Sequence, residues 1–167
     1  MTSHEPPSSR SGRTLRFRVR AGLDVPFTRL SATVVEIGVV ADAGAYATLI
    51  EVVRLGEGAG SANHVVWHAN PSKRQVTPLP TDEAEDLLRG APFRARYSRS
   101  KLRVGGRPME LVEFDHPIEA GPFVLIEPQP GEQVSPPAWA TADVTHDPST
   151  EIYQVVLDAW IRSPAAT

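Results

Sequence analysis

An alternation of apolar and basic side chains near the start of the chain constrains its local structure more than any other feature. Residues 15–20 read L-R-F-R-V-R. The apolar members are Leu15, Phe17 and Val19, and the basic members are Arg16, Arg18 and Arg20. Side chains of a β-strand point alternately to its two faces, so this period of two predicts a strand with one apolar and one basic face.

Most of the remaining chain also has the composition of short strands. Segments rich in β-branched and aromatic residues, bounded by glycine and proline, predict strands over 32–40, 47–55, 63–69, 72–76, 93–104, 109–114 and 123–127. Gly105 and Gly106 separate two of these segments, as in a hairpin turn. We therefore expect a mainly β protein in which a barrel or strongly curved sheet closes the structure.

Two segments have the signals of helices. Thr81 is placed to cap the first helix, with Arg89 in its last turn and Gly90 just beyond. The second should begin after Pro148, because apolar residues then recur at helical spacing: Ile152, Val155, Val156, Ala159 and Trp160. The expected class is thus α+β, with two to three helices packed outside the sheet.

Composition excludes several classes of function. The chain has 167 residues with 41% hydrophobic content, enough for one domain with a core. A net charge of -3 predicts no general attraction to nucleic acid or to a membrane surface. The absence of cysteine excludes disulfides and thiolate metal sites, and no apolar run is long enough to span a membrane. We expect a cytoplasmic protein with a disordered tail over residues 1–13, and the excess of arginine over lysine suggests a bacterial source.

Basic residues also recur on the later strands. Arg99, Lys101 and Arg103 share one face of the segment 93–104, while Arg54 and His68 lie on two others. Like charges on adjacent strands repel unless an anion lies between them, and the planar arginine fork suits phosphate. Two interpretations stay open: a polyphosphate or other oxyanion bound between these strands, or a solvated outer face of the sheet.

The basic residues of the segment 93–104 change from even to odd numbers. Arg94 and Arg96 are even-numbered, whereas Arg99 and Lys101 are odd-numbered. A regular strand would place these two groups on opposite faces. A bulge or kink in this segment near residues 97–98 is therefore expected.

The order of motifs after Arg94 resembles that of the CYTH family, the triphosphate tunnel metalloenzymes. R-S-K-L-R-V (99–104) is similar to the family segment K-x-R-Y-x-V, and M-E-L-V-E-F (109–114) to W-E-V-D-x-F. L-I-E-P-Q (125–129) stands at A-E-V-E, and P-P-A-W-A-T-A-D-V-T-H-D (136–147) resembles the closing P-x-W-L-G-x-E-V-T-x-D. The match covers roughly residues 47–156 and is best after Arg94. It implies a CYTH-like domain over residues 14–163, folded as a closed antiparallel, tunnel-like β-barrel with a charged interior.

The resemblance also implies roles for individual residues. E-V-V-R-L (51–55) and V-V-W-H (65–68) stand at two further basic strands of the family, with Arg54 kept and a histidine in place of lysine. The expected anion-binding residues are Arg16, Arg18, Arg54, His68, Arg99, Lys101 and Arg103. Glu110 and Glu127 match acidic positions and would support the arginines or form a residual metal site. Catalytic residues are not assigned.

Departures from the family pattern decide the expected function. The first strand has R-F-R-V-R where the family has E-x-E-x-K, and residues 72–76 read S-K-R-Q-V where an acidic strand should stand. Mg²⁺ and Mn²⁺ need several oxygen ligands, and metal-assisted hydrolysis depends on them. We therefore expect a domain that binds a phosphorylated or polyphosphate anion, or a nucleotide, with little or no catalysis and no cofactor.

Two alternatives remain from the sequence. One is a metal-dependent inorganic triphosphatase or nucleotide phosphohydrolase, in which Glu110, Glu127 and either Glu36 or Glu51 hold Mg²⁺ or Mn²⁺. The other is a structural or partner-binding domain with a collapsed tunnel.

Overall fold

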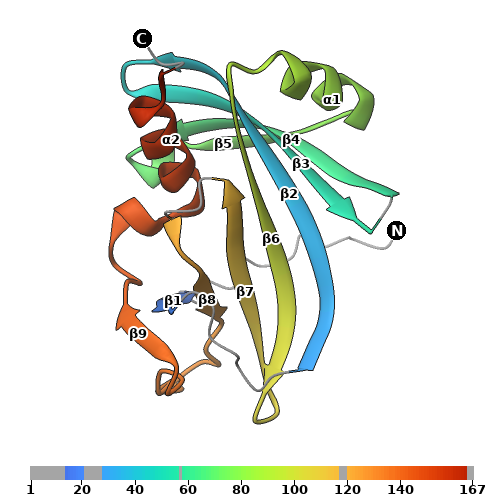
Figure 1. Cartoon of the computed structure of the whole chain (residues 1–167). Coiled ribbons are helices and arrows are strands. Elements are labelled where there is room, and N and C mark those ends of the chain that lie inside the picture. Colours follow the sequence, from blue (N-terminus) through green and yellow to red (C-terminus); the bar gives the residue numbers. More distant parts are fainter. Residues whose placement is uncertain (1–13, 21–27, 57, 117–119, 165–167) are drawn as a thin grey trace, which may run out of the picture.

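A single antiparallel sheet dominates the computed structural model, which describes residues 14–20, 28–56, 58–116 and 120–164. Within these ranges its strands are β1 (Leu15–Val19), β2 (Thr28–Ala43), β3 (Tyr46–Leu55), β4 (Gly58–His68), β5 (Gln75–Leu79), β6 (Phe93–Val104), β7 (Arg107–His116), β8 (Phe123–Ile126) and β9 (Ala140–Asp143). Their order in the sheet is β5-β4-β3-β2-β6-β7-β8-β1-β9 (Figure 1). The mainly β prediction is confirmed, while the expected tail over residues 1–13 lies outside the described ranges.

The two α-helices cover opposite faces of the sheet. α1 (Thr81–Gly90) packs against Ile50 and Val52 of β3, whereas α2 (Ile152–Arg162) packs in a cluster that contains Leu49 of the same strand. Neighbouring residues of a strand point to opposite faces, so the helices lie on different sides. We call the face covered by α2 the inner face and the face covered by α1 the outer face.

The inner face curls around α2. Its apolar cluster joins Trp67 of β4 and Phe123 of β8, which are far apart in the strand order, through Val155 and Val156 of the helix. The prediction that the helices pack outside the sheet is therefore wrong for α2. The physical reason is that this half of the inner face is apolar and offers the helix a surface on which to bury its own apolar residues.

The sheet is open in the described part of the chain, so the expected closed barrel is not confirmed. β5 and β9 are the ends of the strand order and pair only with β4 and β1. A side-chain contact links the β5 end of the sheet to the segment before α2. Arg74, which precedes β5, pairs with Glu151, which precedes α2, at 2.8 Å, and its guanidinium lies 3.4 Å from the centre of the Trp67 ring.

The first strand has the two faces that its alternation predicts. Phe17 and Val19 are buried on the outer side, in a second apolar cluster with Val124 and Ile126 of β8. Trp139 and Val134, from the segment between β8 and β9, pack against this cluster. Arg16 and Arg18 consequently lie on the inner face.

Local geometry agrees with most of the predicted turns and caps. Gly105 and Gly106 both have positive φ (56° and 79°), as the tight hairpin between β6 and β7 requires. The segment 72–76 is only partly a strand, because a 3-10 helix η1 (Pro71–Lys73) precedes β5. Thr81 is the first residue of α1 and Pro80 its N-cap, so the predicted cap is one residue off.

The expected irregularity near residues 97–98 is present, but it lies in β7. β6 pairs regularly with β2 from Phe93 to Lys101, which leaves Arg94 and Arg96 on the outer face and the odd-numbered residues on the inner face. In β7, Asp115 is the extra residue, since Arg96 pairs with His116 and Tyr97 with Phe114. The change of parity therefore reflects two faces of one regular strand.

No helix within the described ranges is long and apolar enough to cross a membrane.

Candidate anion-binding site on the inner face

Strand register arranges the basic residues of the inner face in two rows. The first row runs from β6 to β1 through Arg99, Val112, Phe123 and Arg18. The second runs through Lys101, Glu110, Leu125 and Arg16. Directly opposite residues on adjacent strands share a face, so each row has a basic residue at both ends. Glu110 is the one acidic member of the two rows.

A cavity of about 370 Å³ lies at the β6 end of these rows. Its charged lining residues are Arg99, Lys101, Glu110 and Glu127, and Gln129 also lines it. The predicted basic and supporting acidic residues of the C-terminal half are therefore brought together. With two cations and two carboxylates, the lining of the cavity is formally neutral.

Arg99 and Glu110 form the central ion pair of this cavity. The Nε and Nη2 groups of Arg99 both donate to Oε2 of Glu110, the first at 3.0 Å. Burial alone would lower the pKa of the Arg99 guanidinium, but Glu110 more than offsets this, and the pKa is raised. The ion pair thus holds Arg99 charged and in a fixed orientation.

Arg16, at the far end of the second row, has no comparable partner. Its backbone N–H donates to Oγ1 of Thr145 at 3.0 Å, but its buried Nε has no hydrogen-bond partner among the described residues. Burial lowers the pKa of the guanidinium, and Glu151 and Asp147 oppose this only in part. A buried donor without an acceptor costs free energy, so this group is suited to meet an oxyanion.

Arg18 and Arg103 lie at the margins of the candidate site. Arg18 lies over the ring of Phe123, 5.3 Å from its centre, and lines a separate cavity of about 280 Å³ together with Arg162 and Asp158 of α2. Arg103 is exposed near the end of β6. Neither residue lines the cavity that contains Arg99.

Arg54 and His68 lie on the outer face, away from the other predicted basic residues. Arg54 pairs with Glu85 of α1 at 2.6 Å, and this hydrogen bond raises the pKa of its guanidinium. Nδ1 of His68 accepts a hydrogen bond from the backbone of Asn70 at 2.8 Å, and its ring packs against Tyr46. Both residues follow inner-face residues directly, so alternation turns them outward.

Two carboxylates of the inner face, those of Glu110 and Glu51, already have protein partners. Oε2 of Glu110 is occupied by Arg99, while Glu51 accepts hydrogen bonds from Asn63 at 3.1 Å and from the hydroxyl of Tyr153 at 2.7 Å. Burial and the charge of Glu51 raise the pKa of Tyr153. Glu36 lies on the outer face, and nowhere in the described ranges do three histidine or acidic side chains gather as ligands. A hard cation needs several oxygen ligands, and Glu127 is the other carboxylate that lines the cavity of Arg99.

Arg74 has a structural role that the sequence did not indicate. It lies in the S-K-R-Q-V segment, where the resemblance suggested only the loss of an acidic strand. In the structure it stacks on Trp67, whose Nε1 donates to Gln154 of α2 at 3.2 Å. The ion pair of Arg74 with Glu151 and the hydrogen bond of Trp67 with Gln154 join residues 77 and 87 positions apart, so no local pattern could reveal them.

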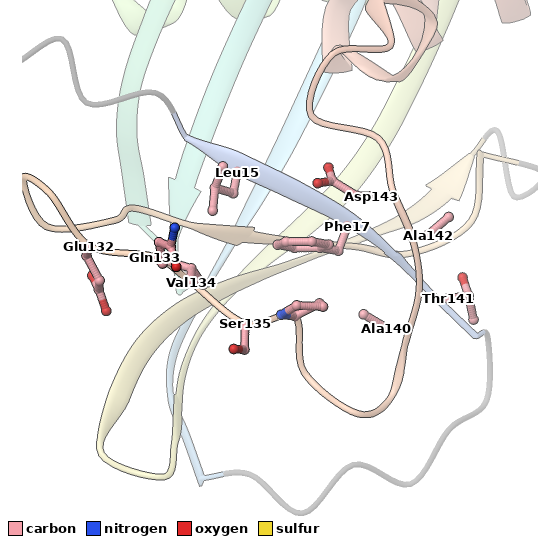
Figure 2. Close-up of a pocket in the computed structure, with 11 residues that line it drawn as sticks. Leu15, Phe17, Glu132, Gln133, Val134, Ser135, Ala140, Thr141, Ala142 and Asp143 are labelled. Atoms are coloured by element: carbon pink, nitrogen blue, oxygen red, sulfur yellow. The ribbon is translucent and has the colours of Figure 1, made fainter.

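Another cavity, of about 690 Å³, lies at a different place on the molecule. Figure 2 shows it between β1, β9 and the segment 132–136, with Leu15 and Phe17 on one wall. Its lining contains the acidic residues Glu132 and Asp143 but no lysine or arginine. It therefore lacks the charge that a phosphorylated anion requires.

Comparison with known proteins supports the fold. Neither a protein-family model nor a curated protein matches the sequence. Among solved structures, one described as the hypothetical protein NE1496 matches with a TM-score of 0.60, and one described as the inorganic triphosphatase NE1496 matches with a TM-score of 0.61. Each is 15% identical and covers 86% of this chain and 96% of its own. The chain thus shares its fold with a protein described as an inorganic triphosphatase, in agreement with the resemblance to the CYTH family.

Proposed function

We propose that this protein binds a phosphorylated anion, either a polyphosphate or a nucleotide, on the inner face of its sheet and hydrolyses it little or not at all. The observation that carries the proposal is the cavity lined by Arg99 and Lys101. Arg16 continues the same face with a buried, unpartnered nitrogen. Two arginine forks and an ammonium group on one concave face are suited to several phosphate oxygens at once.

In this proposal the remaining residues have secondary roles. Arg18 and Arg103 flank the cavity and contribute charge at longer range. Glu110 and Glu127 support the basic residues, as the Arg99–Glu110 ion pair illustrates. Arg54 and His68 are left out of the proposed site because they lie on the outer face.

Little catalysis is expected because phosphoryl transfer needs charge neutralisation and an oriented water molecule, which a divalent cation usually supplies. Glu110 and Glu51 are already engaged with protein groups, which leaves fewer free carboxylate oxygens for such a cation. The arginines retain the capacity to bind phosphate without it.

Thermal unfolding with tripolyphosphate, in EDTA and in Mg²⁺, tests this proposal. A ligand at a hundred times its dissociation constant adds about 2.7 kcal/mol of stability, which is readily measured. We expect the melting temperature to rise in EDTA for the wild type, and to rise much less for Arg99→Gln and Lys101→Gln. Arg54→Gln, on the outer face, is the matched control and should respond like the wild type. An unchanged melting temperature would instead favour a structural or partner-binding domain.

A second candidate is a metal-dependent triphosphatase. The structural likeness to a protein described as an inorganic triphosphatase favours it, as does the presence of Glu110 and Glu127 in one cavity. Phosphate release from tripolyphosphate and ATP with Mg²⁺ or Mn²⁺ separates the two candidates. Metal-dependent turnover that is abolished in Glu110→Gln would replace the binding proposal with this one.

A further inference from the structure

Glu110 occupies the part of Arg99 that a phosphate group would need. The Nε and Nη2 groups form one edge of the guanidinium fork, and both point to a single carboxylate oxygen of Glu110. A phosphate binds arginine most strongly through two parallel hydrogen bonds from such an edge. Glu110 and the ligand therefore compete for the same donors.

The sheet offers Glu110 a second cation close by. Lys101 lies directly opposite Glu110 in the β6–β7 register, whereas Arg99 lies diagonally from it. The Cβ atoms of directly opposite residues are about 5 Å apart, within reach of a glutamate side chain. Lys101 is exposed and has no ion pair with any residue of the described ranges, so it is free to receive Glu110.

We infer that Glu110 is a built-in competitor for the anion: it holds Arg99 in the empty protein and turns to Lys101 when a ligand binds. This inference rests on the proposed function, since it concerns the same cavity. Only side-chain rotation is needed, because both partners of Glu110 already lie on the inner face.

Competition by Glu110 would make the cavity select anions with several charges over singly charged anions. Arg99 is partly buried, and an unpaired cation there would be poorly solvated, so Glu110 keeps it paired in the absence of ligand. A singly charged anion gains little by replacing a carboxylate of the same charge. An anion with two or more charges on neighbouring oxygens gains more from Arg99 and the nearby cations, and can displace Glu110.

Titration calorimetry of tripolyphosphate in EDTA tests the inference with Glu110→Gln and a matched control. Glu127→Gln removes the same charge from the same cavity, and no contact joins Glu127 to Arg99 in the described structure. In the wild type the ligand must break the half-exposed ion pair of Arg99 with Glu110. Glu110→Gln removes this ion pair and should tighten binding by about fivefold, whereas Glu127→Gln should tighten it clearly less. Glu110→Ala, which leaves no amide oxygen on Arg99, should tighten binding as well.

The possible outcomes separate this inference from the function on which it rests. Tighter binding by both Glu110 variants than by Glu127→Gln supports it. Binding by Glu110→Gln that is equal to or weaker than binding by Glu127→Gln overturns it, while the proposed function stands if the wild type binds. If none of the proteins binds tripolyphosphate, the proposed function itself is overturned.

Discussion

The arginines of this protein differ mainly in the side chains that surround them, which their positions in the sequence do not show. Arg99 is held by Glu110 inside a cavity, Arg54 by Glu85 on the outer face, and Arg16 has a buried nitrogen without a partner. All three lie on strands of the same sheet. Their surroundings therefore differ: Arg99 lines a cavity, Arg54 forms an ion pair with a helix, and Arg16 keeps an unsatisfied donor.

Arg16 should contribute to ligand binding while adding nothing to the stability of the protein without ligand. An unsatisfied buried donor costs about 1–3 kcal/mol, so Arg16→Met should leave the free energy of unfolding unchanged or raise it by about 1 kcal/mol. The same variant should respond less to tripolyphosphate. Denaturant unfolding with and without tripolyphosphate measures both effects. A large loss of stability in the absence of ligand would show that Arg16 has a partner that matters for folding.

Glu132 should make stability depend on acid pH. Hydrogen bonds from Arg107 and from the backbone N–H of Gln129 lower the pKa of Glu132 from 4.5 to about 2. A carboxyl whose folded pKa is depressed stabilises the protein above its unfolded pKa, and this contribution is lost as the pH falls toward the folded value. Glu132→Gln should therefore be less stable than the wild type at pH 7, and the difference should shrink between pH 4.5 and pH 2. A difference that stays constant with pH would contradict this account.

At the scale of elements, the sequence shows which segments are strands and helices better than it shows where they pack. The alternation in β1 and the helical spacing in α2 are both local patterns, and both predictions are confirmed. The face chosen by α2 was not predictable, because β3 is apolar on both sides, with Leu49 on the inner and Ile50 on the outer face. An amphipathic helix can bury its apolar stripe on either surface, and only the whole fold decides between them.

The packing of α1 depends on a glycine in β2. A Cβ atom at Gly38 would lie 2.8 Å from Cβ of Ala91 and 2.9 Å from Cδ1 of Leu88, which is too close for either contact. Gly38→Ala should therefore lower the free energy of unfolding by about 1–3 kcal/mol. Gly90→Ala is the same chemical change with no atom within 4 Å, and should be neutral or stabilising. Equal effects of the two changes in thermal unfolding would rule out this packing argument.

At the scale of the whole molecule, a long-range ion pair links the β5 end of an open sheet to the segment before α2. The resemblance to the CYTH family implied a closed barrel with a charged interior, and the structure places Arg99, Lys101 and Glu110 in one cavity of an open sheet. It placed Arg54 on the wrong side for a ligand, because a shift of one residue in a strand match reverses the face of every side chain. The open arrangement could not be read from the sequence, since it depends on long-range contacts such as that of Arg74 with Glu151.

Arg74 should contribute to stability far more than an exposed arginine does. Its ion pair with Glu151 is partly buried, and its guanidinium stacks on Trp67, so Arg74→Gln should cost about 2 kcal/mol. Arg89, which pairs with Asp86 on the exposed side of α1, is the matched control, and Arg89→Gln should cost less than about 0.5 kcal/mol. Urea unfolding compares the two variants, and equal losses would mean that the contacts of Arg74 add no more stability than an exposed ion pair.

Phosphorus NMR of tripolyphosphate mixed with the protein and Mg²⁺ tests most directly whether this cavity binds a phosphorylated anion without hydrolysing it. The account predicts that the tripolyphosphate resonances broaden or shift as protein is added, and that they keep their total intensity over hours. Steady conversion to pyrophosphate and phosphate would contradict the absence of catalysis. Resonances that are unaffected by the protein would contradict binding.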